Sequence, residues 1–242
     1  MYTRDDRPAG SVNPPAVWFR YSPDRKGIHP QPHLKDYAGI LQADAYAGYD
    51  AVYASGRVLE AGCWAHARRK FHDIHAHAPT ALSTGALAQI AAFYAIESEI
   101  RGSPPEQRQA IREARTQPLM AAFKIWLLEQ LATLSRKSVM ADAINYSLNH
   151  WEALTRFTAD GRIEIDNNAA ERALRTVALG RKNYLFLGSD VGGERAATLY
   201  SLLGTAKLND INPEAYLRHV LTVIADYPVN RVSALLPWRV AL

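Results

Sequence analysis

The stretch Ile165-Asp-Asn-Asn-Ala-Ala-Glu-Arg-Ala-Leu-Arg175 decides the fold prediction, because a strand is expected to turn into a helix there. Ile163 and Ile165 alternate with polar residues, which is typical of a short strand. The three residues 166–168 are all favourable at a helix N-terminus. We therefore expect a helix over about 169–179 that ends at the following glycine.

Glu171 lies on the first turn of this predicted helix, and two interpretations of it are open. It follows Asn168 by three residues, which is the spacing of a capping box. It precedes Arg175 by four residues, which is the spacing of an exposed ion pair on one helix face. In the other interpretation Glu171 is a metal ligand over a phosphodiester, with Arg172 and Arg181 nearby. That interpretation requires a second carboxylate from elsewhere in the chain.

The composition is that of a globular protein. The 242 residues are 48% hydrophobic and 10% aromatic, which is enough for a core. No apolar run approaches the length of a membrane span, and no apolar stretch follows the charges of the N-terminus, so we expect no signal peptide. The single cysteine, Cys63, excludes an internal disulfide and suits a reducing cytoplasm. A formal charge of +4 and a pI near 9.2 allow a nucleic-acid partner.

The pattern divides the chain into three regions. Residues 1 to about 64 are predicted to alternate strands with short helices, which indicates a mixed or parallel sheet. From about 65 to 157, apolar residues recur at helical spacing and predict a helical bundle inserted into the α/β region. The remainder contains a strand-like run at 184–187 and two further helices. The second of these helices begins at Asn212, a cap residue, followed by Pro213.

Asp44 is the candidate for the second carboxylate. It follows the short apolar strand predicted at 39–43, at the carboxyl edge of the sheet, where open α/β sheets place functional groups. Hard divalent ions such as Mg²⁺ need oxygen ligands. Two such ions about 4 Å apart activate water and stabilise the leaving oxygen of a phosphodiester. The alternative for Asp44 is a turn acid or cap before the next helix.

Several long segments occur in one order along nearly the whole chain. They are Tyr21-Ser-Pro-Asp-Arg25, Leu41-Gln-Ala-Asp-Ala-Tyr-Ala-Gly-Tyr49, Ala61-Gly-Cys-Trp-Ala-His-Ala-Arg-Arg-Lys-Phe71, Ile165 to Arg175, Gly180-Arg-Lys-Asn183, Ser201 to Asn209 and Leu235-Leu-Pro-Trp238. Together they resemble the transposases of the insertion-sequence-66 family, which belong to the DDE class. Several motifs in one order are far more specific than any one of them.

The resemblance implies an α/β fold with a ribonuclease H-like mixed sheet. Residues 1–195 would form the catalytic domain, with a large all-helical insertion at about 72–158, and residues 196–242 a helical C-terminal element. The implied activity is hydrolysis of DNA at transposon ends with Mg²⁺ or Mn²⁺, followed by joining of the freed 3′-hydroxyl to target DNA. The implied partners are the end and target DNA, further copies of the chain or other proteins of the element, and no membrane. The implied location is the bacterial cytoplasm, at the nucleoid.

The resemblance also assigns site residues. Asp44 matches the second acid of the family and Glu171 best matches the third, both as catalytic metal ligands. Asp166 competes with Glu171, because it too lies at the strand-to-helix junction. The basic residues implied to contact DNA phosphates, largely independently of sequence, are Arg68, Arg69, Lys70, Arg172, Arg175, Arg181 and Lys182. For the run 68–70 the alternative is a solvated helix face.

The sequence departs from the family pattern at its start. The first acid of the family lies on the first strand, upstream of the segment Tyr2 to Pro8 in which this sequence begins. We therefore expect a sheet without its first, central strand and without the family's N-terminal DNA-binding portion. Two hypotheses stand: a catalytic-core fragment that cleaves and joins DNA, and a truncated remnant, inactive by itself, that keeps DNA or protein binding.

Overall fold

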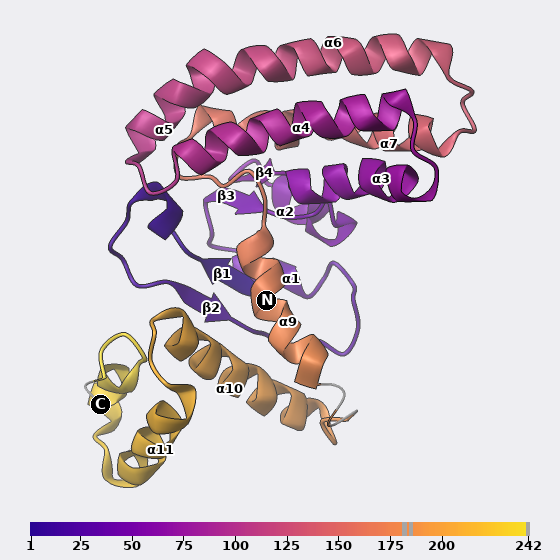
Figure 1. Ribbon diagram of the computed structural model, residues 1–242. Coiled ribbons are helices and arrows are strands. Elements are labelled where there is room, and N and C mark those ends of the chain that lie inside the picture. Colours follow the sequence, from indigo (N-terminus) through magenta and orange to yellow (C-terminus); the bar gives the residue numbers. More distant parts are fainter. Residues whose placement is uncertain (181–182, 184–185, 241–242) are drawn as a thin grey trace. The chain divides into compact units, whose positions relative to one another are not determined.

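The chain is mostly helical and contains two small sheets in the computed structural model, which describes residues 1–180, 183 and 186–240 (Figure 1). It divides into two compact units. They are Met1–Arg7, Val12–Arg25 and Asn168–Leu242 in the first unit, and Pro8–Ser11 and Lys26–Asn167 in the second. The described strands form one antiparallel pair and one parallel pair, in two small sheets, and the predicted single mixed sheet is not shown among them.

The first unit contains the antiparallel strand pair and the C-terminal helices. Its elements are β1 (Tyr2–Arg4), β2 (Ala16–Trp18), α9 (Asn168–Gly180), α10 (Asp190–Leu208), α11 (Pro213–Val223), η5 (Ile224–Asp226) and η6 (Val229–Leu235); η1 (Arg7–Ala9) also begins here. Of the strand-like run predicted at 184–187, residues 184 and 185 lie outside the described residues, and Phe186 and Leu187 are exposed and not in a strand.

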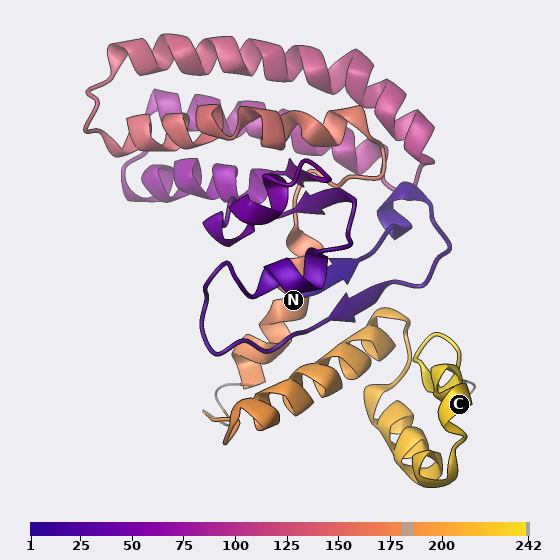
Figure 2. The ribbon, with the colours of Figure 1, turned by 180° about the vertical axis from the view of Figure 1, so that it is seen from behind.

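Helix α10 closes the outer edge of β2, and Figures 1 and 2 both show the two elements side by side. The Thr205 hydroxyl accepts a hydrogen bond from the Val17 N–H at 3.1 Å. The Ser201 hydroxyl accepts one from the Phe19 N–H at 2.8 Å. Buried backbone N–H groups need partners. Side chains of α10 supply them here, so this edge of the pair needs no third strand.

The start of α11 confirms a sequence prediction. Asn212 caps the helix, because its side chain accepts hydrogen bonds from the N–H groups two and three residues further on, at 2.9 and 3.0 Å. Pro213 occupies the first helical position, where its missing N–H costs nothing. The helix packs through Tyr216, which is buried and donates a hydrogen bond to the Leu235 carbonyl at 2.8 Å.

The second unit contains the parallel strand pair and the helical block. Its elements are α1 (Pro30–Leu34), β3 (Gly39–Gln42), η2 (Ala47–Tyr49), α2 (Asp50–Tyr53), β4 (Val58–Ala61), α3 (Trp64–His77), α4 (Ala81–Glu99), α5 (Pro105–Ile111), the π-helical η3 (Arg112–Thr116), α6 (Gln117–Thr133), α7 (Val139–Asn149), α8 (Trp151–Thr155) and η4 (Arg156–Ala159). Strands β3 and β4 pair in parallel, with Gly39 opposite Val58 and Gln42 opposite Ala61.

The prediction of a strand before Asp166 is wrong. Ile163 and Ile165 are both buried, as their alternation requires, but no strand forms there. The Trp64 N–H donates to the Ile165 carbonyl at 3.1 Å, and the Gln42 side-chain amide donates to the Glu164 carbonyl at 2.7 Å. These bonds hold the segment although no ladder of strand pairing forms.

The helical block predicted at about 65–157 is confirmed as helical, and its apolar stripes form the core. Trp64 lies at the centre of this core and is fully buried. Its ring centroid lies 5.2 Å from that of Phe93 and 6.0 Å from that of Trp151, and its indole N–H donates to the Leu154 carbonyl at 2.7 Å. Among the described residues, no helix is both long and apolar enough to cross a membrane.

Helices α5 and α6 form one continuous helix, joined by a single π-helical turn. The Gln117 N–H donates to the Arg112 carbonyl, five residues earlier, where an α-helix would use the carbonyl four residues earlier. Pro118 explains the change: it has no N–H, and its ring collides with the carbonyl four residues before it in a regular helix. The wider turn relieves that collision and keeps the helix continuous (Figure 1).

A buried ion-pair network ties this turn to the rest of the block. Glu97 is 8% exposed, and Arg108 and Arg112 are 1% and 0% exposed. Arg112 binds both oxygens of the Glu97 carboxylate at 2.6 and 2.8 Å, and it donates to the Phe157 carbonyl at 2.7 Å. Arg108 donates to Glu97 at 3.2 Å and to the Glu164 carboxylate at 2.5 Å. Two positive groups are thus buried against two carboxylates.

Replacing Glu97 with Ala is expected to lower the free energy of unfolding by about 3–5 kcal/mol, because it leaves buried guanidinium groups without their shared partner. Urea denaturation measures the loss. Glu99→Ala is the matched control, because it removes an exposed pair with Arg115 in which both groups remain hydrated. Its effect is expected to be far smaller. Similar losses in the two variants would contradict a special role for the buried network.

Candidate functional site

Asp44 lies two residues beyond the end of β3, at the carboxyl edge of the parallel strand pair. Its side chain is 45% exposed. The next residue, Ala45, has a φ of +60°, a left-handed conformation that non-glycine residues rarely adopt. Such strained backbone positions cluster at functional sites, where the surrounding structure holds them. The exposed carboxylate therefore stands on a strained turn.

His66 lies beside Asp44, with 3.7 Å between its Nε2 and the Asp44 Oδ2. It lies on the first turn of α3, which begins just after β4. The Ala43 N–H donates to the Ala61 carbonyl at 3.0 Å and extends the pairing of the two strands to their ends. Parallel pairing thus brings the residue after one strand close to the helix that follows the other.

Gln42 links three parts of this edge. Its side-chain amide donates to the Gly62 carbonyl at 3.0 Å and to the Glu164 carbonyl at 2.7 Å. The end of β3, the end of β4 and the segment that leads to Asp166 are therefore held by one side chain. This role of Gln42 was not predicted from the sequence. The available signal was a polar residue at the end of an apolar strand, two positions before Asp44.

Asp166 is tied to the same region of the second unit. The Tyr94 hydroxyl donates to its Oδ2 at 3.0 Å. The next N–H, that of Asn167, points at the Cys63 sulfur at 3.5 Å. Burial raises the pKa of the Tyr94 phenol, and the negative charge of Asp166 and the hydrogen bond to it raise that pKa further. Burial likewise raises the pKa of the Cys63 thiol, so Cys63 is a packing residue in its neutral form.

The predicted acids divide between the two units. Asp44 and Asp166 belong to the second unit, whereas Glu171 belongs to the first and lies half-buried on the first turn of α9. Carboxylate oxygens are the donors that Mg²⁺ prefers, so all three fit such an ion by their chemistry. Within the part of the chain that the structure describes, no three His, Cys, Asp or Glu side chains gather closely enough to hold a metal ion.

The basic run predicted to contact DNA lies on α3. Arg68, Arg69 and Lys70 are all exposed. Lys70 lies over the ring of Tyr146, with 4.3 Å between its ammonium nitrogen and the ring centroid, which is a cation–π distance. The positive charge of Arg68 is close enough to Tyr94 to lower the pKa of that phenol against the larger raising effects. Arg68 therefore places positive charge near Tyr94, the residue whose hydroxyl binds Asp166.

The other predicted basic residues follow Glu171. Arg172 and Arg175 are exposed on α9, a helix in which no described residue is fully buried. Arg181 and Lys182 lie outside the described residues. Contact of any of these residues with phosphates stays a prediction.

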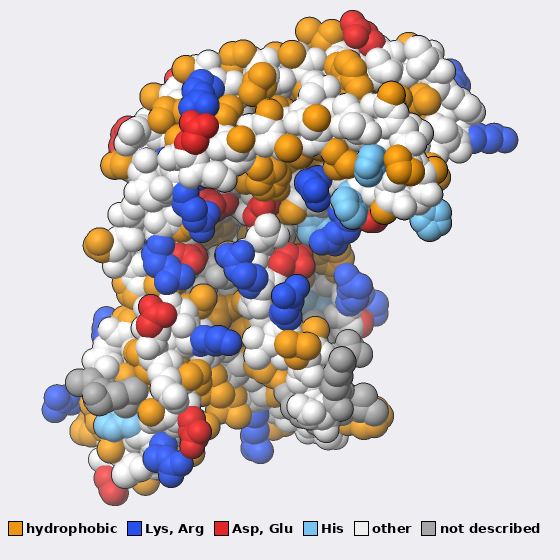
Figure 3. Space-filling model, viewed as in Figure 1, with side chains coloured by type: hydrophobic (Ala, Val, Ile, Leu, Met, Phe, Trp, Pro, Cys, Tyr) orange, Lys and Arg blue, Asp and Glu red, His pale blue; other side chains and the backbone are white. Residues whose placement is uncertain are grey.

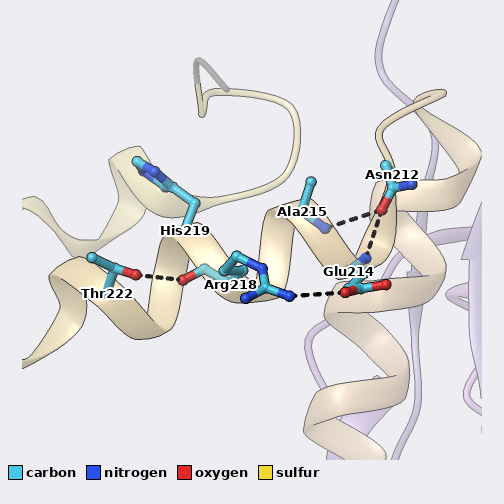
Figure 4. Close-up of a pocket in the computed structure, with 6 residues that line it drawn as sticks. All are labelled: Asn212, Glu214, Ala215, Arg218, His219 and Thr222. Atoms are coloured by element: carbon cyan, nitrogen blue, oxygen red, sulfur yellow. Dashed lines mark hydrogen bonds and ion pairs between the residues drawn. The ribbon is translucent and has the colours of Figure 1, made fainter.

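A shallow hollow lies on α11 in the first unit (Figure 4). It is lined by Asn212, Glu214, Ala215, Arg218, His219 and Thr222. These residues come from one helix and its cap, and Arg218 pairs with Glu214 at 3.0 Å. The hollow contains none of the acids or basic residues predicted from the sequence, and the side chains of Asn212, Glu214, Arg218 and Thr222 already bind each other or the helix backbone.

Two known families match the chain in neighbouring ranges. Residues 1–195 match the family described as "Transposase IS66 family", and residues 201–238 match the one described as "IS66 C-terminal element". The chain is 43% identical over 256 residues to the uncharacterized protein y4hP of Sinorhizobium fredii and 40% identical over 247 residues to y4qI of the same organism. Each alignment covers 98% of this chain and 46% of the relative.

The chain therefore spans about half the length of the curated relatives it matches. A shorter match, 46% identical over 48 residues, links 20% of the chain to the uncharacterized protein YuaK of Escherichia coli and covers 51% of that protein. No solved structure matches the chain.

The raised pKa of Tyr94 predicts a dependence of stability on pH. The folded protein holds the phenol proton more tightly than the unfolded chain, whose tyrosines ionise near pH 10. The resulting stability is fully present below about pH 10 and is lost as the pH rises from there through the folded pKa. Tyr94→Phe is expected to make the fall in unfolding free energy above about pH 10 shallower, by up to about 1.4 kcal/mol per pH unit.

Urea denaturation of wild type and Tyr94→Phe at several values between pH 8 and 11.5 measures the two slopes. Loss of the hydrogen bond to Asp166 costs about 1 kcal/mol at every pH in this range, so it shifts the curve without changing its slope. Equal slopes in the two proteins would refute the pKa shift.

Proposed function

The chain belongs to the IS66 family of transposases, and on that premise we propose that it carries the metal-dependent chemistry of a DDE transposase. That chemistry is hydrolysis of DNA at the ends of the insertion sequence and joining of the freed 3′-hydroxyl to target DNA. The observation that carries the proposal is Asp44, an exposed acid on a strained turn at the carboxyl edge of two parallel strands. Functional groups gather at such edges.

The proposal includes the ribonuclease H-like fold and its division into domains. Residues 1–195 would be the catalytic domain, with the helical insertion at about 72–158, and residues 196–242 the C-terminal element. Two observations support it. The parallel pair is followed by a helical block that leads directly to Asp166, and the two family matches meet between residues 195 and 201.

Asp44 and Glu171 are proposed as ligands of Mg²⁺ or Mn²⁺, with Asp166 as the competitor of Glu171. When bound, the ions supply an activated water and stabilise the leaving oxygen of the phosphodiester. Gln42 would position Asp166, because its amide holds the preceding backbone against the end of β4. Asp166 has a described neighbour in the Tyr94 hydroxyl, and Glu171 has the N-terminal end of α9, where negative charge is favoured.

A second candidate function is DNA binding without catalysis. The exposed basic side chains on α3 and α9 favour it, because phosphate contacts by Lys and Arg need no metal ion. The same residues serve both candidates, so DNA binding alone does not distinguish them. The acids do.

Replacing Asp44 with Asn tests the catalytic proposal. We expect strand joining on transposon-end DNA with Mg²⁺ or Mn²⁺ to be lost, and Mn²⁺ binding measured by calorimetry to weaken by at least about tenfold. Asp50→Asn is the matched control, since Asp50 is an exposed acid on the neighbouring helix α2 and is expected to have little effect. Glu171→Gln and Asp166→Asn, measured in the same way, identify the third ligand.

Strand joining that survives in Asp44→Asn refutes the assignment of Asp44. DNA binding that is equal in wild type and Asp44→Asn, with strand joining in neither, supports the non-catalytic candidate instead.

Replacing Arg68, Arg69 and Lys70 together with Ala tests the DNA-binding run. The slope of log affinity against log salt concentration is expected to become shallower by up to about 0.9 for each phosphate that is no longer neutralised. Arg136→Ala with Lys137→Ala is the control, because it removes exposed positive charge from the loop between α6 and α7. Anisotropy titrations with duplex DNA at several salt concentrations give both slopes. Equal changes in the two variants would indicate a non-specific effect of net charge.

A further inference from the structure

Helix α6 carries an apolar stripe on the face opposite to its core contacts. Met120, Phe123 and Leu127 point into the core and are fully buried. The opposite face exposes a second row of apolar residues, here called the outer stripe. It consists of Pro118, Ala121, Ile125, Leu128 and Ala132, all exposed. Figure 3 shows hydrophobic side chains along the upper edge of the molecule, over α6.

The outer stripe has the spacing of a coiled coil. Its members follow one another by three, four, three and four residues, which is the a–d repeat of a heptad. Ile125, which is 59% exposed, occupies an a position, and Leu128, which is 50% exposed, occupies a d position. Within parallel coiled coils, a β-branched residue at a with Leu at d favours two helices over three or four. Ala121 and Ala132 allow close approach at the two ends.

The charges beside the outer stripe suit the same pairing. Lys124 occupies a g position and Glu129 an e position, and both are exposed. In a parallel pair, each g residue faces the e residue five positions further along the partner helix. Lys124 of each helix would therefore face Glu129 of the other, twice by symmetry. An antiparallel pair would bring like positions together and oppose equal charges.

We propose that the outer stripe of α6 binds the outer stripe of a second copy of the chain, in parallel and about a twofold axis. The contact is isologous, so the same residues serve on both sides. The stripe covers about 22 Å of helix, which is short for a standard interface. The pairing is therefore a weak and reversible dimerisation. It goes beyond the proposed chemistry, because no acid or basic residue assigned to that chemistry takes part.

Sedimentation equilibrium of the full chain over about 5–200 µM tests the dimer. Wild type is expected to associate reversibly to a dimer. Ile125→Glu and Leu128→Glu are each expected to raise the dissociation constant at least tenfold, because they place a charge in the seam. Val139→Glu is the matched control: Val139 is 66% exposed at the start of α7, outside the stripe, and its substitution is expected to leave the dimer intact.

A charge exchange tests the parallel register. Lys124→Glu and Glu129→Lys each place like charges opposite one another in a homodimer, so each variant alone is expected to dimerise several-fold more weakly. An equimolar mixture restores opposite charges at both contacts and is expected to form the mixed dimer at wild-type affinity. Because Lys124 also lies 5.7 Å from the ring centroid of Trp151, thermal unfolding of each variant is measured beside the association.

Three outcomes overturn the proposal: a wild-type chain that stays monomeric throughout this range, association that survives Ile125→Glu, and a mixture no tighter than its components. A monomeric wild type would mean that the outer stripe binds a different protein. Association that survives Ile125→Glu would place the contact on another surface. A mixture no tighter than its components would reject the parallel register.

Discussion

The burial of Trp64 is the constraint on which the second unit depends. Its indole ring packs against Phe93, Phe123 and Trp151, so helices from three places in the chain share one core with it. Its two N–H groups are satisfied in different directions, the indole by the Leu154 carbonyl and the backbone by the Ile165 carbonyl. Since Trp64 follows β4 by only a few residues, the same side chain anchors the strand pair to the helical block.

Polar side chains hold the segment that follows the helical block. The chain leaves the helical block through residues 160–167, which form neither helix nor strand. Gln42 and Arg108 hold this segment by its backbone carbonyl and its carboxylate at Glu164. Breaking a buried pair of this kind leaves a guanidinium or a carboxylate without a partner at high cost. Asp166 therefore emerges at a defined place beside Tyr94.

Elements built from local contacts could be predicted from the sequence, and elements built from distant ones could not. The strand before Asp44, the helical block and the cap at Asn212 follow from periodicity and capping within a few residues. The predicted strand at Ile163 and Ile165 was wrong because a strand exists only beside a partner strand, and the partners here are Trp64 and Gln42. Periodicity likewise did not predict how the edge of β2 is satisfied, because the side chains that do so lie on α10, far away in the sequence.

The sequence by itself determined the family, through ordered motifs, and it determined that Asp44 follows a strand and that α6 has an apolar core face. Only the tertiary structure decided that Ile125 and Leu128 remain exposed, that Gln42 bridges two chain segments, and that Glu97 is buried between arginines. The physical reason is that spacing records which residues share a face of one element. Burial and partnership depend on which other elements pack against that face, and those lie far away in the sequence.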